Sequence, residues 1–135
     1  MEITPSGVLG MIPRLKLTPT AIAVLGIMSE LQSPGGEVNY SQVEMAERLG
    51  LLESAVSRGM KCLVNRNLVI RSGDGRGHSY RLHPFIAKYT SETEMETALR
   101  AAAVEIREGR LPDIAAPLYR KQPPRASGRP NLVAV

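Results

Sequence analysis

The chain has 135 residues, of which 43% are hydrophobic and 22% are charged, as in ordinary globular domains. This length accommodates one domain with a modest core and one appended element. The longest apolar run, within residues 21–28, is too short to cross a bilayer, and the first residues lack the pattern of a signal peptide. The single cysteine, Cys62, excludes an internal disulfide and is typical of a reducing compartment. We therefore expect a cytoplasmic protein that does not enter a membrane.

The positive charge is concentrated in one part of the chain. The formal net charge is +4 and the sequence pI is about 9.6. Residues 54–81 hold six basic side chains against one acidic side chain, whereas residues 1–53 hold more acidic than basic ones. Such a local excess is typical of a surface that contacts nucleic-acid phosphates. A solvated basic face without a partner would give the same pattern, so the charge alone leaves both interpretations open.

The N-terminal stretch is irregular and the first helix follows it. Residues 1–16 mix apolar side chains with two glycines and two prolines, which forbid a long regular helix. We expect a short helix there, or an arm over the core of this domain or of a second subunit. Thr18 and Pro19 then form a helix start, with a hydroxyl N-cap and proline at the first helical position. This helix runs to about Leu31 and is apolar on several sides, which predicts a core helix.

A second helix follows the break at residues 33–36. Between the two, residues 37–40 could add a short strand to a later hairpin. Ser41 and Glu44 have the spacing of a capping box, in which each side chain satisfies the backbone N–H of the other residue. Gly50 ends the helix in a backbone conformation that is favourable mainly for glycine.

Residues 52–65 are expected to form a third helix with two unlike faces. At about 100° per residue, one face is apolar and holds Leu52, Val56, Gly59, Met60 and Leu63. The opposite face holds the polar residues Ser54, Arg58, Lys61 and Asn65, flanked by Ser57 and Cys62. We attribute Gly59 on the buried side to a close approach of the preceding helix. Two such helices around a glycine turn indicate a helix-turn-helix, although a generic helical hairpin gives the same pattern.

A two-stranded hairpin is expected at residues 68–82. One face would pack through Leu68, Ile70, Tyr80 and Leu82. The other would point outward with Val69, Ser79 and two arginines, Arg71 and Arg81. Three glycines lie in the connection, residues 72–78, and Arg76 at its tip can enter a minor groove or meet a phosphate. Glycine-rich turns join many hairpins, so Arg76 could equally be solvated.

The C-terminal part contains one more helix and a tail. Ser91 and Glu94 have the spacing of a second capping box, and a helix is expected from Glu92 to about Arg110. Its narrow apolar stripe, Met95, Leu99, Ala102, Ala103 and Ile106, could dock on its own domain or form a homodimer through residues 92–110. Residues 112–135 are basic and rich in proline, which predicts a disordered tail.

These elements predict a mainly α fold with a small β wing, namely a winged helix-turn-helix plus a C-terminal helix. The expected organisation is an arm at residues 1–16, a DNA-binding domain at residues 17–89 and a helix for packing or dimerisation at residues 90–111. The tail at residues 112–135 completes it.

The stretch from Leu17 to Tyr89 resembles the winged-helix DNA-binding family. The similarity is carried by Leu17–Ala21, by the sequence Ala-Glu-Arg-Leu-Gly-Leu at residues 46–51, and by residues 55–64 followed by 68–71. Two branches are similar, the MarR-type transcription regulators and the plasmid replication initiators. The latter is suggested by residues 80–86, where His83 occupies the position of a usual asparagine. Leu52 departs from the serine or threonine N-cap that is usual before the recognition helix, at a cost of about 1 kcal/mol.

The expected contacts to double-stranded DNA follow from this arrangement. The recognition helix would enter the major groove with Ser54, Ser57, Arg58, Lys61 and Asn65, Arg58 being the best candidate for a bidentate contact to guanine. The wing would contact the backbone or minor groove through Arg71, Arg76 and Arg81. Ser41 and Gln42, together with Tyr40, would fix the preceding helix on phosphate.

Three functions are compatible with this interpretation. The first is a sequence-specific, nucleoid-associated transcription regulator, preferred because so short a chain leaves little room for a domain that recruits a replication machinery. The second is a plasmid replication initiator that binds an origin. The third is a winged-helix module that binds a protein partner through the same surface.

Other chemistry finds little support in the sequence. His78, His83 and Cys62 lack metal-ligand spacing, and each histidine is expected in the wing or at the surface. Lys61 and Arg58 lie near Cys62 and could make it a redox sensor, but a small, half-buried residue is the preferred interpretation. No cofactor motif or catalytic constellation is visible, so we expect no enzymatic activity.

Overall fold

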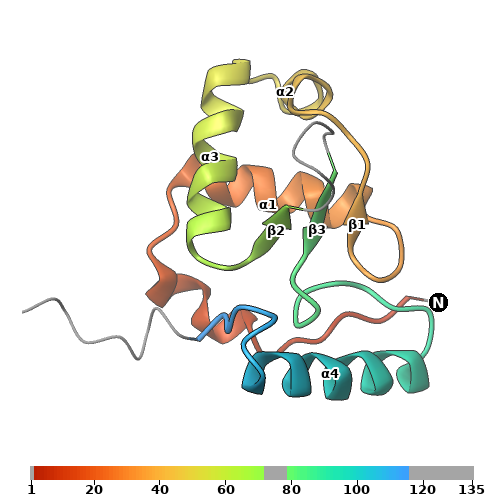
Figure 1. Ribbon diagram of the computed structural model, residues 1–135. Helices are drawn as coiled ribbons and strands as arrows, with labels where there is room; N and C mark the ends of the chain where they lie inside the picture. Colours follow the sequence, from red (N-terminus) through yellow and green to blue (C-terminus); the bar gives the residue numbers. More distant parts are fainter. Residues whose placement is uncertain (1, 72–78, 116–135) are drawn as a thin grey trace, which may run out of the picture.

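The computed structural model describes residues 2–71 and 79–115, which are mainly helical with a small antiparallel sheet (Figure 1). The fold class expected from the sequence, mainly α with a small β component, is confirmed at this level. The elements in chain order are the 3₁₀ helix η1 (Leu9–Leu15), α1 (Pro19–Leu31), β1 (Glu37–Val38), α2 (Gln42–Leu49), α3 (Glu53–Asn65), β2 (Val69–Arg71), β3 (Tyr80–Leu82) and α4 (Glu92–Arg107). The wing connection with Arg76 and the tail beyond residue 115 lie outside the described residues.

Helix α1 is the central element. It begins as expected, because the Thr18 hydroxyl oxygen accepts a hydrogen bond from the Ala21 N–H at 3.1 Å and Pro19 occupies the first turn. Ala21, Val24 and Met28 are fully buried. In Figure 1, α1 runs across the middle of the molecule, with α2, α3 and the sheet around it.

Helix α2 has the predicted ends. The capping box is complete: Ser41 Oγ accepts from the Glu44 N–H at 3.1 Å, and Glu44 Oε1 accepts from the Ser41 N–H at 2.8 Å. Gly50 closes the helix with φ 68°, in the left-handed region where glycine has no steric penalty. The chain then needs only residues 50–52 to turn into α3.

Helix α3 buries the expected face except at its start. Val56, Met60 and Leu63 are fully buried. Leu52, placed on the apolar face by the helical projection, is instead the N-cap residue and is 76% exposed. The projection fails there because the N-cap has extended backbone, with φ −71° and ψ 148°, and its side chain therefore leaves the helical stripe.

Gly59 marks the closest approach between two helices, and its partner differs from the expected one. A Cβ atom at Gly59 would lie 3.1 Å from Val24 Cγ2 and 3.2 Å from the backbone C and O of Thr20. The glycine therefore accommodates α1, whereas the sequence interpretation assigned this approach to the preceding helix, α2. The prediction assumed that the helix adjacent in sequence makes the contact, and the order of the helices does not show which one crosses α3 at Gly59.

The sheet has the strand order β1-β3-β2, all antiparallel, so residues 37–38 do add a strand to the hairpin. Its register pairs Val69 with Leu82, Ile70 with Arg81 and Arg71 with Tyr80. Directly paired residues lie on the same face, which puts Arg71 and Arg81 on opposite faces. The predicted alternation of the first strand is therefore wrong.

The reason for this shift lies at the start of the hairpin. The chain turns at Asn67, which has φ 66°, and the Leu68 N–H bonds back to the Leu63 carbonyl at 3.0 Å. Leu68 is fully buried as part of this turn, before the strand begins. Val69 then takes the inward position in β2, and Ile70 is only half-buried.

Both ends of the described chain pack on this domain. Ile3 pairs with Tyr89, and Val8 and Leu15 are buried, so the N-terminal arm covers its own core. Residues 112–115, assigned to a disordered tail by composition, are ordered here: Ile114 is fully buried, and Asn67 Nδ2 donates to the Asp113 carbonyl at 3.1 Å.

Helix α4 also rests on its own chain. It lies along the lower edge in Figure 1, and Ala102 is buried while Met95 and Ala98 pack against the core. Ala103, expected in the same stripe, is exposed. Homodimerisation through residues 92–110 stays a prediction, and the packing of Met95 and Ala102 on their own domain leaves less of the stripe for a second copy.

His83 is fully buried, contrary to the expected surface position. Its Nδ1 accepts from the Phe85 N–H at 3.1 Å, so Nε2 is the protonated nitrogen that donates to the Pro112 carbonyl at 2.7 Å. Burial lowers the pKa of His83, and the charge of Arg81 acts in the same direction, against the Pro112 hydrogen bond and the charge of Asp113. The neutral imidazole thus joins the hairpin exit to the C-terminal segment.

Replacing Gly59 by alanine should destabilise the protein by about 1 kcal/mol or more, because the new methyl group meets the α1 backbone, which cannot move aside without disturbing the core. Gly26→Ala in α1 is the matched control: its Cβ would meet nothing within 4 Å, and the gain in helix propensity should stabilise by up to about 1 kcal/mol. Urea unfolding measures both. Equal effects of the two substitutions would contradict the close approach.

The free energy of unfolding should fall as the pH is lowered below about 6.5, the ordinary histidine pKa. In that range the unfolded chain binds a proton that the folded protein, with the lowered pKa of His83, does not bind. The contribution is complete above this pH and is lost as the pH falls toward the folded value. The free energy of unfolding, measured with urea between about pH 5 and 7.5, should depend less steeply on pH for His83→Asn, which has no titrating group at residue 83. If the variant shows the same pH dependence as the wild type, His83 is not the cause of that dependence.

Candidate nucleic-acid interface

The outward face of α3 gathers five of the residues singled out from the sequence. All five are exposed and lie opposite the buried side chains of Val56, Met60 and Leu63; they are Ser54, Ser57, Arg58, Lys61 and Asn65. None of their side chains forms a hydrogen bond or an ion pair with another residue in the described part of the chain. Their donors are therefore available to a ligand.

The C-terminal half of this face is hollowed. Arg58, Lys61, Cys62, Asn65 and Arg66 line a shallow depression of about 340 Å³. Two guanidinium groups, one ammonium group and one amide can each donate to an anion placed there, and arginine forks match the oxygens of a phosphate. Chemically, the depression suits an anionic group.

Arg66 was not among the candidates from the sequence. It caps α3, its backbone N–H bonding to the Cys62 carbonyl at 3.1 Å and to the Leu63 carbonyl at 3.2 Å. A signal was present, because Arg66 follows Cys62 by four residues and so continues the same side of the helix. Arg66 was left out because the predicted helix ended at Asn65, one residue before it.

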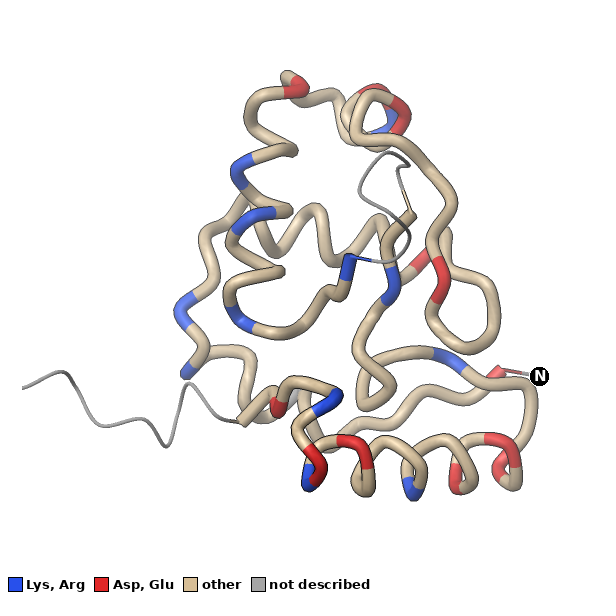
Figure 2. The backbone as a smooth tube through the Cα atoms, in the orientation of Figure 1, with Lys and Arg blue, Asp and Glu red and all other residues tan. Residues whose placement is uncertain are grey.

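Charge is distributed unevenly over the molecule. Figure 2 shows basic positions along α3 and along the connection from η1 to α1, which lie on the same side of the molecule. Acidic positions gather on α4 and α2, where a few basic positions also lie, and Glu53 opens α3. Beyond Glu53 the charged residues of α3 are all basic, so this side of the helix presents a positive surface to a polyanion.

The two polar residues at the start of α2 are engaged within the protein. The Ser41 hydroxyl oxygen caps α2, as described above. Gln42 Nε2 donates to the Tyr80 hydroxyl at 3.0 Å, which ties α2 to β3. Both residues are half-buried. They position α2 against the sheet, and the Ser41 O–H, the second Gln42 N–H and the Gln42 side-chain carbonyl are what they can still offer a ligand.

The arginines of the hairpin diverge. Arg71 is exposed at the end of β2. Arg81 is half-buried on the opposite face of the sheet, where it lines a hollow of about 200 Å³ together with Tyr89 and the α4 residues Ala98, Ala102 and Glu105. The structure therefore does not bring Arg81 to the α3 surface, because the register turns it toward α4. Arg76, the third wing candidate, lies outside the described residues.

Comparison of the chain with protein-family models, with curated proteins and with solved structures found no match. Within residues 2–71 and 79–115, no group of histidine, cysteine or acidic side chains could hold a metal ion. No helix in that part of the chain is long and apolar enough to cross a membrane.

The turn between α2 and α3 exposes apolar side chains. Leu51 is 37% exposed and Leu52 76%, and Val43 in the first turn of α2 is 46% exposed. Leu52 also occupies the N-cap without a side-chain acceptor, so it serves the first turn of α3 through its backbone carbonyl, which accepts from the Ala55 N–H at 3.0 Å and from the Val56 N–H at 3.1 Å.

Leu52→Ser should stabilise the protein by about 1 kcal/mol, because a serine oxygen at the N-cap can accept from the N–H of Ser54 while Ala55 keeps its bond to the carbonyl of residue 52, and little burial is lost. Leu51→Ser, at an exposed position that is not a cap, serves as the control and should give no gain. The urea midpoint measures both. A Leu52→Ser midpoint at or below that of the wild type would contradict the capping argument.

Proposed function

We propose that this chain is a sequence-specific, double-stranded DNA-binding protein with a winged helix-turn-helix, and that it acts as a transcription regulator. The observation that carries the proposal is the division of α3 into a fully buried side and a cationic side whose donors have no partner among the described residues. Thirteen helical residues span about 20 Å, and the major groove, about 12 Å wide, admits such a helix.

The support beneath α3 favours this role. The close approach at Gly59 fixes α3 on α1, and the short turn after Gly50 fixes it relative to α2. A reading helix must be held rigidly, since base contacts require placement within a fraction of an ångström. In the proposed complex, α2 crosses the DNA backbone and α3 enters the major groove.

In the proposed complex, some side chains of α3 contact bases and others contact phosphates. Arg58 lies near the middle of the exposed face and reads guanine through its two parallel donors. Neutral donors and acceptors come from Ser54, one turn nearer the helix start, from the adjacent Ser57, and from Asn65 near the helix end. The depression between Arg58 and Arg66 receives a phosphate, with Lys61 at its rim.

The hairpin takes the role of the wing. Arg71, exposed at the end of β2, contacts the backbone beside the groove. Arg81 has no part in the proposed interface, since it lies on the α4 side of the sheet. The Gln42 hydrogen bond to Tyr80 holds the wing against α2, so both approach the duplex together.

The regulatory output needs its own experiment. Plasmid replication initiation, the other function suggested by the resemblance, uses the same kind of DNA surface. Fragments of the source genome bound by the purified protein should be selected and sequenced. Enrichment of promoter regions supports a transcription regulator, whereas enrichment of a replication origin supports an initiator.

One observation favours a second candidate, a module that binds a protein partner. The exposed apolar residues Val43, Leu51 and Leu52 would suit an apolar partner surface better than phosphates. An electrophoretic shift with random duplexes at low and moderate salt separates the two. Failure of the protein to retard any duplex at about 50 mM salt would reject DNA binding and leave the partner module.

Arg58→Ala should weaken binding to the selected site by about 1–3 kcal/mol and relax the preference at one base pair, because alanine cannot form the bidentate hydrogen bonds to guanine. The matched control is Arg100→Ala, at an arginine that is also exposed and lies in the middle of α4, and this variant should bind as the wild type does. Fluorescence anisotropy on the selected duplex and on single-base variants measures both effects. Equal affinities of Arg58→Ala and the wild type would show that this assignment of contacts is wrong.

A further inference from the structure

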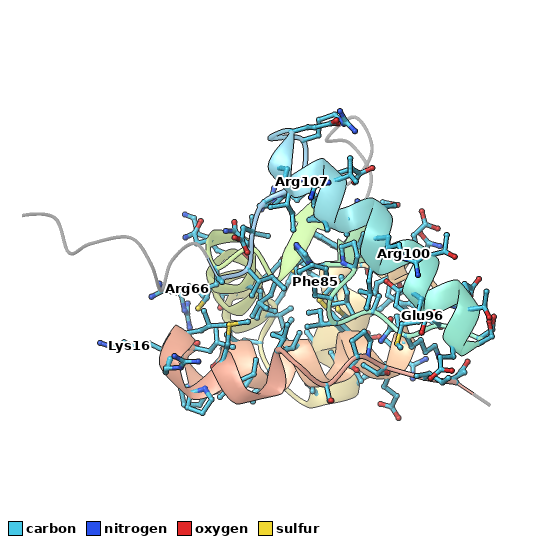
Figure 3. The ribbon with its side chains drawn as sticks, turned by 90° about the horizontal axis from the view of Figure 1, so that it is seen from below. Lys16, Arg66, Phe85, Glu96, Arg100 and Arg107 are labelled. Atoms are coloured by element: carbon cyan, nitrogen blue, oxygen red, sulfur yellow. The ribbon has the colours of Figure 1, made fainter. Side chains whose placement is uncertain are left out.

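The cationic surface continues beyond α3 onto a segment that the proposed interface does not use. Arg14 lies in the last turn of η1 and Lys16 is its C-cap residue, and both are exposed. Neither forms an ion pair or a side-chain hydrogen bond with the described residues. Figure 3 shows Lys16 and Arg66 at the same edge of the molecule, far from Arg100 and Glu96 on α4.

This segment is attached firmly to α3. Lys16 precedes the Thr18 N-cap of α1 by two residues, and Thr20 in the first turn of α1 is the backbone that touches Gly59. On the other side, Leu15 is only 1% exposed and anchors η1 in the core. The backbone that carries the two cations is therefore held in a fixed relation to α3 through α1.

The backbone at Lys16 has an unusual conformation. It is left-handed, with φ 56° and ψ 49°, a region that few residues other than glycine adopt. Such a residue persists where its surroundings determine it, here the buried Leu15 before it and the half-buried Leu17 after it. The side chain of Lys16 at this turn is exposed and lies at the same edge of the molecule as Arg66 (Figure 3).

The length of α3 indicates what these cations can reach. From Arg58 to Arg66 a helix rises about 12 Å, close to the width of the major groove. With Arg58 at the bases, the end of α3 comes to the phosphate strand that bounds the groove. Cations beyond Arg66 then face backbone phosphates, which carry no sequence information.

We propose that Arg14 and Lys16, together with Arg66, bind the phosphate backbone that flanks the groove occupied by α3. This inference rests on the proposed DNA-binding function and assigns it a second, sequence-independent contact. The partner is the same DNA duplex, engaged outside the base pairs that α3 reads. Binding is purely ionic and hydrogen-bonded, each cation displacing counterions from one phosphate.

The test compares the wild type with Arg14→Gln/Lys16→Asn, in which asparagine tolerates the left-handed backbone at residue 16. Affinity for the selected duplex and for an unrelated duplex is measured by anisotropy from about 50 to 200 mM salt. The slope of log K against log salt should become less steep by about 0.9 for each phosphate that is no longer neutralised. Both duplexes should weaken by the same factor. Arg14→Gln alone, which leaves the turn at Lys16 intact, should give about half the change.

Arg100→Gln, with the same loss of charge on α4, is the control and should retain the wild-type slope. If the double variant keeps the wild-type affinity and slope while Arg58→Ala weakens binding, this inference is overturned and the proposed function stands. If the wild-type protein binds no duplex at all, the proposed function fails and the inference fails with it.

Discussion

The contact between α1 and α3 at Gly59 is the constraint on which the other parts depend. A side chain at this position would hold the helices apart, and glycine allows the Thr20 backbone to approach α3 directly. The approach closes the core over Val24, Val56 and Met60, all fully buried. One side of α3 is thereby fixed, so its polar side is presented as a rigid row of donors. The close packing of α1 against α3 therefore determines how precisely the polar face of α3 is positioned.

Local chemistry predicted most of the helices. Thr18-Pro19, the Ser41 and Glu44 pair and Gly50 each form the predicted cap, because capping depends on neighbouring residues and on backbone groups within one turn. The five polar residues of α3 likewise fall on one exposed face, since helical periodicity is a property of the element itself. These helix caps and the polar face of α3 were therefore predicted correctly from the sequence.

Most of the wrong predictions concern features that depend on contacts between residues far apart in the sequence. The partner of Gly59 and the burial of His83 depend on tertiary contacts that no local pattern encodes. The first strand of the hairpin was misassigned for another reason, because the left-handed turn at Asn67 makes Leu68 part of the turn. Arg81 is the clearest case for the candidate site: alternation correctly separated it from Tyr80, but only the register and the position of α4 show that it faces away from α3. Ile114 was missed because a single apolar residue in a proline-rich segment resembles a linker.

The burial of Ile114 has a consequence for how the protein is made. Its side chain completes the core from near the C-terminal limit of the described residues, and the Asn67 and His83 hydrogen bonds secure the same segment. While the ribosome is still adding residues before 114, the nascent chain holds every helix of the positive surface but lacks a piece of the core beneath it. Folding of this domain therefore reaches completion only after this segment has emerged, so the core beneath α3 closes after all the helices that surround it have been synthesised.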